Sequence, residues 1–549
     1  MSDANEFSTQ RQKKLMAITE LGFEPYPRRF DLSHTLPEVL AAFSARTAEE
    51  LAAESAERRA VRVAGRMMTI RPHGKAGFAH LAGGGARLQV YVRQDSVSAR
   101  DWELYKLLDI GDLVGVAGYL FRTKTGELTV HAERLEFLAK ALLPLPEKWH
   151  GLADVEIRYR QRYLDLMVNA EVRKVFETRS RAVGAIRNFL DAEGFLEVET
   201  PMMQTLPGGA MARPFKTHHN TLDLDLYLRI APELYLKRLI VGGLERVYEI
   251  NRNFRNEGIS TQHNPEFTML EFYQAYADYR DMMALTERML GQVAQEVLGK
   301  TECEFAGHTI SLARFERLTM KEAIVKFWPA ERGPKLEELA EPKAAFRWVE
   351  SFNLWARRPR ALEETALRQG SGSSTQRVAG GTDAVSAGDP LMDRSTSTEP
   401  IALPAGIAPG MALQALFEAV AEHHLIQPTF VLDYPLEVSP LSKQKPGDPN
   451  FVERFELYIG GMEIANAFSE LNDPAEQRDR FKYQQMLREK GDLAAHAVDE
   501  DYIRALSYGM PPTGGEGIGI DRLAMLFTNS RSIREVILFP LLRPEKHGE

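Results

Sequence analysis

The spacing of apolar residues changes near residue 150, and this change divides the chain into parts of different structure. Between residues 61 and 138, short segments of alternating apolar and polar residues are separated by turn-rich sequence; these segments are 61–64, 87–92, 113–118 and 128–131. So many short strands in so short a stretch predict a small β-barrel such as an OB-fold. OB-folds often bind single-stranded nucleic acid on aromatic side chains, and the alternative is a β-domain with a purely structural role.

After residue 150 the apolar residues recur at helical spacing. The residues that carry this pattern are Val172, Val175, Phe176, Val183, Ile186, Phe189 and Leu190. Gly194 can end that helix, and residues 195–200 then read as a strand that runs into Pro201. Because 549 residues are too many for one hydrophobic core, we expect several domains. The predicted fold class is α+β, with a helical extension over residues 1–60, a barrel over 61–148 and a larger domain over 149–549.

Residues 361–400 fit neither pattern. They are rich in serine, threonine and glycine, as in 370–375 and 394–398, and they lack hydrophobic periodicity. Such a segment cannot bury enough apolar surface to order itself. We interpret it as a disordered insertion in a surface loop, and a wrongly translated stretch is the alternative that composition leaves open.

Composition excludes several kinds of protein. The single cysteine, Cys303, excludes an internal disulfide framework and a cysteine-rich zinc site. Residues 1–6 lack the features of a secretory signal, and no apolar run is long enough to cross a bilayer. We therefore expect a cytoplasmic protein without a membrane segment. The net charge of −9 does not exclude nucleic acid, because a local basic face can bind phosphates. Arg11, Lys13 and Lys14 are a candidate for such a face, and a solvated helix is the alternative.

Residues 244–273 predict an antiparallel hairpin. One strand runs to about Arg255, residues 258–265 are polar and turn-like, and a second strand covers 267–273. Side chains alternate along a strand, so one face of the second strand carries Phe267, Met269, Glu271 and Tyr273. That face suits a ligand with an aromatic base at one end and an amine at the other. Arg255 offers a planar fork of donors for a phosphate or a carboxylate.

A second glycine-rich segment, residues 514–522, ends in Arg522. The spacing of Gly515, Gly517 and Gly519 differs from the dinucleotide-binding fingerprint of Rossmann folds. The sequence Gly-Lys-Thr at 299–301 lacks the earlier glycine of a P-loop. Neither common nucleotide-binding fold is therefore predicted.

Residues 456–463 predict another hairpin, with a two-residue turn at Gly460 and Gly461. With that turn, Tyr458 is expected to face Glu463 and Glu456 to face Ala465, so both glutamates lie on one face. Ala465 and Ala467 are expected on that face too, leaving room for a ligand. Two carboxylates and the phosphates of ATP are a usual environment for Mg²⁺, and a pair of exposed glutamates is the alternative.

Three separated segments together resemble the motifs of the class II aminoacyl-tRNA synthetases. Residues 254–257 with 263–271 resemble motif 2, residues 514–522 resemble motif 3, and the helix, strand and proline over 171–201 resemble motif 1. The surrounding residues look most like the lysyl-tRNA synthetases. The resemblance implies a class II catalytic domain with an antiparallel sheet flanked by helices, a homodimer formed through residues 171–201, and Mg²⁺. It also implies activation of L-lysine by ATP and transfer of the lysyl group to the 3′ end of tRNA(Lys).

The resemblance implies roles for individual residues. Arg255 would be catalytic and hold the α-phosphate and the lysine carboxylate; Arg522 would be catalytic and stack on the adenine. ATP would also contact Glu257, His263, Asn264 and Phe267. Lysine would contact Gly209, Glu233, Glu271, Tyr273, Asn466, Phe468 and Glu470. Glu456 and Glu463 would hold Mg²⁺, and the anticodon would contact Arg71, Phe78 and Gln89.

Two details of this assignment conflict with simple patterns. Alternation places Asn466, Phe468 and Glu470 on the opposite face from Glu463, so a bulge or a strong twist between 463 and 466 is required. Glu516 stands where the family resemblance predicts an apolar residue.

The acidic pocket favours lysine over its rivals, because a buried ammonium needs carboxylate partners. The alternatives are an aspartyl- or asparaginyl-tRNA synthetase, a non-catalytic RNA-binding paralogue, and an enzyme that lysylates a protein.

Overall fold

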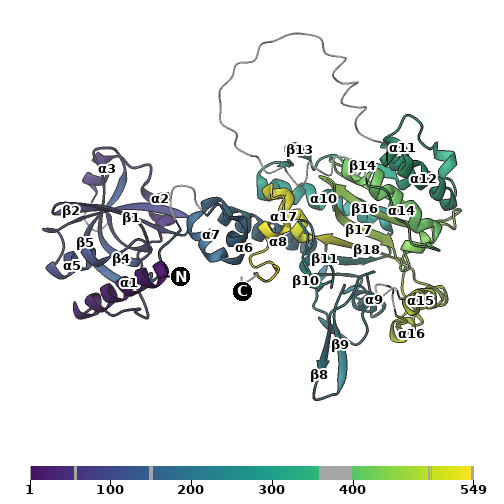
Figure 1. The fold of residues 1–549 in the computed structure, drawn as a ribbon, viewed down its shortest axis with the longest axis horizontal. Coiled ribbons are helices and arrows are strands. Elements are labelled where there is room, and N and C mark those ends of the chain that lie inside the picture. Colours follow the sequence, from purple (N-terminus) through teal and green to yellow (C-terminus); the bar gives the residue numbers. More distant parts are fainter. Residues whose placement is uncertain are drawn as a thin grey trace, which may run out of the picture. The chain divides into compact units, whose positions relative to one another are not determined.

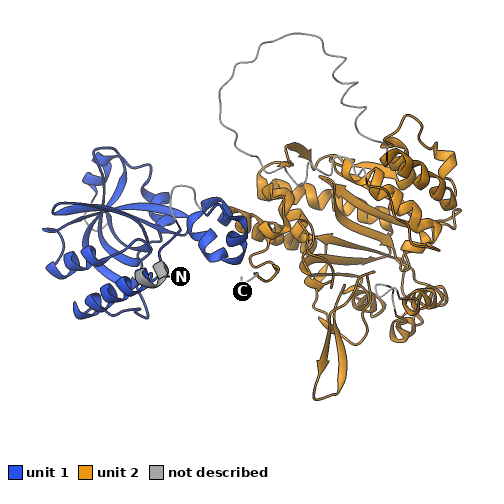
Figure 2. Cartoon of the chain, viewed as in Figure 1, with its two compact units in different colours: residues 1–173 blue, residues 174–549 orange. Residues whose placement is uncertain are grey.

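The computed structural model describes residues 2–54, 59–146, 152–357, 399–491, 495 and 497–545. The chain forms two compact units, Met1–Arg173 and Lys174–Glu549 (Figure 2). The predicted insertion over 361–400 lies outside the described residues except at 399 and 400, and the predicted boundary at 148 lies outside them as well.

A closed five-stranded barrel forms the body of the first unit (Figure 1). Around the barrel its strands are β1 (Ala60–His73), β2 (Ala76–Gly83), β3 (Ala86–Arg93), β5 (Leu128–Ala139) and β4 (Leu113–Arg122). Burial alternates along β1, with Val61 and Val63 inside, as a barrel strand requires. The predicted barrel is confirmed. The sequence pattern omits β2, because its alanines and glycines have low β-propensity.

Helices precede and follow the barrel strands in the sequence, and one lies between β3 and β4. They are α1 (Ser2–Glu20), α2 (Leu36–Phe43), α3 (Ala48–Ala53), α5 (Ala99–Leu107), α6 (Val155–Arg160) and α7 (Arg162–Val168). Thr35 and Thr47 cap α2 and α3, and each forms a reciprocal capping box with the glutamate three residues later. These caps fix the starts of two helices that are too short to be stable alone.

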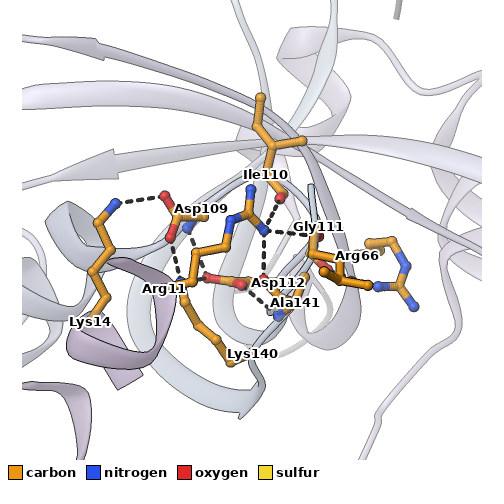
Figure 3. A network of polar contacts seen from close by, with 10 residues as sticks. Arg11, Lys14, Arg66, Asp109, Ile110, Gly111, Asp112, Lys140 and Ala141 are labelled. Atoms are coloured by element: carbon orange, nitrogen blue, oxygen red, sulfur yellow. Dashed lines mark hydrogen bonds and ion pairs between the residues drawn. The ribbon is translucent and has the colours of Figure 1, made fainter. Parts of the chain in front are cut away.

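A polar network joins α1 to the barrel (Figure 3). Nζ of Lys14 lies 2.6 Å from Oδ1 of Asp109, and the fully buried Nζ of Lys140 lies 2.6 Å from Asp109 and 2.7 Å from Asp112. Arg11 donates to the carbonyl oxygen of Ala141 at 2.6 Å. Burial acts to raise the pKa of Asp109, but the two lysines hold it below its ordinary value. Arg11 and Lys14 thus anchor α1, a structural role that neither a phosphate-binding face nor a solvated helix predicts.

An eight-stranded mixed sheet organises the second unit (Figure 1). Its order is β14 (Glu316–Thr319), β15 (Thr429–Pro435), β16 (Phe451–Ile459), β17 (Met462–Ser469), β18 (Thr513–Gly519), β11 (Glu266–Ala275), β10 (Arg246–Phe254) and β6 (Leu196–Glu197). The central pairs are antiparallel, as predicted. The two outermost pairs, β14 with β15 and β6 with β10, are parallel, and each is joined by the long connection that parallel pairing requires.

Helices cover one face of this sheet. The main ones are α8 (Ala170–Ala192), α10 (Tyr279–Leu298) and α17 (Ile520–Thr528), whose apolar residues form one core with those of the strands. Asp278 caps α10 through a capping box with Asp281, and Gly299, with φ of +76°, ends it. The helix predicted before Gly194 is confirmed as α8, while the strand after it is shorter than predicted.

The remaining elements lie around the sheet. They are β7 (Met203–Gln204), β8 (Lys216–His219), β9 (Leu224–Leu228), α9 (Glu233–Val241), β12 (Glu302–Phe305), β13 (His308–Ser311), α11 (Met320–Lys326), α12 (Ala345–Ala356), α14 (Pro409–Val420), α15 (Pro474–Glu489), α16 (Glu500–Leu506) and α18 (Ile533–Val536). Throughout the described part of the chain, every helix is too short or too polar to cross a bilayer.

Candidate active site

A cavity of about 610 Å³ opens on the sheet of the second unit. Its walls come from β11, β16, β17 and β18, with the loop after β10, the start of α9 and part of α14. Fourteen of the residues proposed for ATP, lysine and Mg²⁺ line it: Gly209, Glu233, Arg255, Glu257, His263, Asn264, Phe267, Glu271, Tyr273, Glu456, Glu463, Asn466, Phe468 and Arg522. Glu470 does not line it. Segments more than 300 residues apart thus meet in one cavity.

Strand β11 supplies one wall by the predicted alternation. Phe267, Met269, Glu271 and Tyr273 all line the cavity, while Leu270 and Phe272 point into the core beneath. Strand β11 pairs with β10 on one side and with β18 on the other, and this pairing fixes which of its faces lies toward the cavity. The predicted hairpin and its ligand-facing side are confirmed.

Arg255 follows β10 directly and brings an unpaired cation into the cavity. No carboxylate of the described residues lies within ion-pair distance of its guanidinium, and its buried Nε has no hydrogen-bond partner there. The guanidinium lies 5.0 Å from the centre of the Phe267 ring. Burial lowers its pKa, and the nearby Glu463 and Glu257 oppose that shift. Such a group stabilises an incoming anion strongly, because its desolvation has already occurred.

Arg522, at the start of α17, is held by other site residues. Its Nη1 donates to the carbonyl oxygen of Glu463 at 2.5 Å, and its Nη2 lies 3.2 Å from Nε2 of His263. Asp521 beside it accepts from Arg179 at 2.5 Å and from the backbone N–H of Thr268 at 2.7 Å. Because of these contacts, the guanidinium is fixed across the cavity from β11 before any ligand binds.

The loop between β10 and β11 holds the other predicted ATP contacts. Glu257 and His263 are exposed at the cavity edge, and Ser260 Oγ lies 2.9 Å from Nδ1 of His263. Asn264 is buried; its Nδ2 donates to the carbonyl oxygen of Glu266 at 2.6 Å, and its Oδ1 accepts from the N–H of Leu541. The Asn264 side chain therefore shapes the loop with both of its polar atoms.

Strands β16 and β17 form the predicted hairpin, but with a different register. Gly460 and Gly461 have φ of +63° and +70°, as a type I′ turn requires, and Tyr458 faces Glu463 as predicted. A bulge then follows, so Glu456 faces Asn466 instead of Ala465. The extra residue turns Asn466 toward the ligand side, as the family resemblance requires.

The same bulge corrects the predicted place of two alanines. Ala465 and Ala467 are buried in the core on the other face of the sheet, so they do not make room for a ligand. A one-residue shift moves every following side chain of a strand to the opposite face, and turn residues alone do not reveal it.

Glu456 and Glu463 form the acidic end of the cavity, where Glu418 also lines the wall. Glu456 is buried; its Oε1 accepts from Arg454 at 2.5 Å and its Oε2 accepts from Tyr458 at 2.6 Å. Nearby Glu422 has its pKa raised to about 7 by burial and by the surrounding carboxylates. This concentration of negative charge suits a divalent cation.

A magnesium ion fits these residues only together with a ligand. Among the described residues, no group of three or more histidine, cysteine, aspartate or glutamate side chains could hold a metal ion by itself. Mg²⁺ is commonly bound by one or two carboxylates plus the phosphates of a nucleotide, and Glu456 and Glu463 can supply those two carboxylates.

The opposite end of the cavity carries a second acidic group. Tyr273 donates to Oε2 of Glu271 at 3.2 Å, and both side chains are buried. Burial raises the pKa of Glu271 to about 8, and the neighbouring Glu233 adds to this shift. A cationic ligand would restore ionisation of Glu271, so this end favours ammonium groups.

Glu470 lies behind this end of the cavity, where it contacts Lys237. Both side chains are buried, and Nζ of Lys237 also lies 2.5 Å from Oε1 of Glu233. Burial alone would lower the pKa of Lys237, but Glu233 and Glu470 raise it above its ordinary value. We therefore assign an ammonium ion to Lys237. The sequence analysis did not predict the contact between Lys237 and Glu470.

Two glycines of β18, Gly514 and Gly515, allow close packing against neighbouring residues. A Cβ on Gly514 would lie 2.9 Å from the carbonyl oxygen of Asp278, and one on Gly515 would lie 2.4 Å from Cε1 of Tyr273. Glu516, which follows Gly515, is buried and accepts from Thr286 at 2.6 Å. The hydroxyl of Thr286 is what allows a carboxyl group at this unexpected position.

The proposed anticodon residues lie together on the barrel of the first unit. Arg71 on β1 faces Phe78 on β2, and the Phe78 ring lies 4.6 Å from that of Tyr91 on β3. The Gln89 amide donates to Glu127 at 2.6 Å and accepts from Thr129 at 2.8 Å. Tyr91 and Glu127, which the sequence analysis did not single out, thus contact two of the proposed residues.

Two family models match successive parts of the chain. Residues 154–543 match the family model described as "tRNA synthetases class II (D, K and N)", and residues 61–138 match "OB-fold nucleic acid binding domain". The chain is 52% identical over 545 residues to a lysine–tRNA ligase of Pelotomaculum thermopropionicum, covering 99% of this chain and 96% of that protein. It is 50% identical over 543 residues to that of Carboxydothermus hydrogenoformans, covering 99% of both chains. This chain belongs to the lysine–tRNA ligase family. A member from Citrobacter koseri is 48% identical over 548 residues, covering 100% of this chain and 98% of that protein.

Family membership confirms the resemblance and the fold class that the motifs predicted. The class II model covers aspartate, lysine and asparagine enzymes together, so lysine is favoured by the full-length relatives and by the acidic end of the cavity.

Proposed function

We propose that this protein activates L-lysine with ATP and transfers the lysyl group to the 3′ end of tRNA(Lys). One observation carries the proposal: the unpaired guanidinium of Arg255 lies in the same cavity as Glu233 and Glu271. A cation suits the carboxylate and α-phosphate of the reactants, and the carboxylates suit two ammonium groups. Lysine and ATP together satisfy all these groups.

In the first step, an oxygen of the lysine carboxylate attacks the α-phosphorus of ATP. A new bond forms between that oxygen and phosphorus, the bond to the bridging oxygen breaks, and pyrophosphate leaves. Arg255 neutralises the charge that grows on the α-phosphate oxygens, and Arg522 orients the nucleotide from the opposite wall. No side-chain nucleophile is required, because positioning and charge neutralisation accelerate the reaction.

In the second step, a 3′-terminal ribose hydroxyl of tRNA attacks the carbonyl carbon of the adenylate. The ester bond to ribose forms and AMP leaves with the former carboxylate oxygen. Phe267, Glu257, His263 and Asn264 are proposed to hold the nucleotide during both steps. Bound Mg²⁺, held by Glu456 and Glu463, would neutralise phosphate charge.

Lysine is proposed to lie along β11 with its carboxylate toward Arg255. Glu271 and Tyr273 receive its ammonium groups together with Glu233, and the remaining proposed contacts are Gly209, Asn466, Phe468 and Glu470. An aspartate or asparagine enzyme would need a cation or amide donors here. Buried carboxylates at this end instead penalise an anionic side chain.

The barrel is proposed to bind the anticodon of tRNA(Lys). Phe78 offers a ring on which an unpaired base can stack, Gln89 offers hydrogen-bonding groups, and Arg71 can contact the backbone or a base edge. A homodimer is proposed through residues 171–201, whose neighbourhood exposes the apolar side chains of Leu196, Met202 and Met203. A cytoplasmic location is expected for a protein that charges tRNA.

The deciding experiment is ATP–pyrophosphate exchange with each of the twenty amino acids in Mg²⁺. We expect exchange with lysine alone. Exchange with aspartate or asparagine would overturn the assignment of the acidic pocket, and no exchange would favour a non-catalytic protein. Transfer of labelled lysine to tRNA, measured beside transfer to protein, separates the tRNA ligase from a protein-lysylating enzyme.

A further inference from the structure

A buried ammonium group stands behind the proposed lysine pocket. Lys237 lies one helical turn after Glu233 on α9, and its side chain is fully buried. Its Nζ lies 2.5 Å from Oε1 of Glu233, contacts Oε2 of Glu470, and lies 5.3 Å from the centre of the Phe468 ring. All three of those neighbours belong to the proposed lysine site, but Lys237 itself does not line the cavity.

The charges around this end of the cavity do not balance without a ligand. Three buried carboxylates gather here, from Glu233, Glu271 and Glu470, and Lys237 is the cation in contact with two of them. A lysine ligand adds two ammonium groups. One internal ammonium and two from the ligand then match three carboxylates, whereas a ligand with one ammonium leaves one carboxylate uncompensated.

We propose that Lys237 is a positioning residue that fixes the carboxylates of Glu233 and Glu470 and sets the charge of the pocket for a ligand with two ammonium groups. This inference rests on the proposed activation of lysine. The internal cation contacts both carboxylates in the empty enzyme and favours their ionised forms against the effect of burial, so these two side chains are already in place when lysine binds. Preorganisation of this kind lowers the cost of binding.

Other groups that face this cluster do not replace the internal cation. Tyr273 from β11 and Tyr502 from α16 are neutral hydroxyls beside Glu233 and Glu470. Arg454 from β16 acts on Glu233 only at a distance, because its own contacts are with Glu456 and Asn466. Arg238, the next residue on α9, pairs with Asp499 outside the cavity.

A charge-balance cycle tests the proposal by ATP–pyrophosphate exchange. Lys237→Met leaves one carboxylate too many and Glu470→Gln leaves one too few, so each should raise the KM for lysine about tenfold or more. The double variant Lys237→Met with Glu470→Gln restores the balance and should recover most of the loss. The KM for ATP should change less than about twofold throughout. Arg238→Met is the matched control, because it removes the neighbouring cation from the same helix without touching the pocket.

The pH dependence separates positioning from mere support of the fold. Lys237→Met removes the cation that favours the ionised carboxylates, so its lysine KM should fall more steeply with rising pH than that of the unaltered protein, and the double variant should lose this added steepness. A double variant no better than Glu470→Gln alone would overturn the proposal. If Lys237→Met does not fold, the comparison of Glu470→Gln with the double variant still tests the proposal. Absence of lysine-dependent exchange in the unaltered protein would instead refute the proposed function.

Discussion

A Cβ atom on Gly515 would lie 2.1 Å from Oε1 of Glu470. The glycine of the third motif therefore makes room for a carboxylate of the lysine pocket. Two segments of the sequence that carry separate motif signals are coupled at this point, and neither motif can change there independently of the other.

Gly515→Ala should consequently damage the lysine end of the site. The new methyl group would also lie 2.4 Å from Cε1 of Tyr273, so both side chains must move. We expect a loss of stability of about 1–3 kcal/mol and a raised KM for lysine. Gly519→Ala is the stability control, since its Cβ would meet no atom closer than 3.7 Å. Thermal unfolding and exchange kinetics measure the two effects; equal stability of both variants would contradict the clash.

Arg255→Ala should abolish formation of the adenylate while the protein remains folded. Its guanidinium has no ion pair among the described residues, so its removal breaks no structural contact apart from packing on Phe267. Arg255→Lys should restore little activity, because an ammonium lacks the planar fork of donors. Exchange kinetics measure adenylate formation and circular dichroism measures the fold. Near-normal exchange in the alanine variant would contradict the assigned role of Arg255.

Glu271→Gln should raise the KM for lysine and flatten its dependence on pH. Burial raises the pKa of Glu271 to about 8 from 4.5, so the free enzyme holds a proton there at neutral pH. Lysine binding favours the ionised form, and KM should fall as the pH rises toward 8. The free energy of unfolding follows the opposite trend with pH. The raised pKa of Glu271 stabilises the folded protein below a pH of about 4.5, and this stabilisation is lost as the pH rises through about 8. The glutamine variant should lack both trends.

Glu516→Leu should stabilise the protein above neutral pH. The buried carboxyl has Thr286 as its hydrogen-bond partner, and burial raises its pKa well above the ordinary value. Because the raised pKa makes folding less favourable as the pH rises, an apolar residue removes a penalty of about 1–3 kcal/mol. Thr286→Val should accompany it, so that no buried hydroxyl is left unpaired. A lower melting temperature for the double variant at pH 8 would refute this account.

Phe78→Ala should weaken aminoacylation of tRNA without affecting lysine activation. The ring lies on the barrel, within the first unit, whereas every residue that lines the cavity belongs to the second. Loss of one stacked base costs about 1–3 kcal/mol, so the KM for tRNA should rise roughly tenfold to a hundredfold. Exchange kinetics that change in parallel with aminoacylation would contradict the separation of the two activities.

Patterns among residues close together in the sequence predicted much of this site. Alternation along 267–273 predicts which side chains of β11 face the cavity, because a strand permits only two faces. The two glycines at 460 and 461 predict their turn, because only residues that tolerate positive φ form it easily. The order of the three motif-like segments predicts the family, because each segment carries its chemistry in a short span.

Contacts between distant segments were decided only by the tertiary structure. The bulge in β17 that turns Asn466 toward the ligand depends on how β16, β17 and β18 pack together, and no turn residue encodes it. The contact of Lys237 with Glu470, the bond from Thr286 to Glu516 and the use of Arg11 to hold α1 are all of this kind. The sequence by itself determined which residue types the site contains, since those depend on local spacing. Their partners depend on burial and register across the whole sheet, because a buried charge is stable only where folding brings a second charge to it.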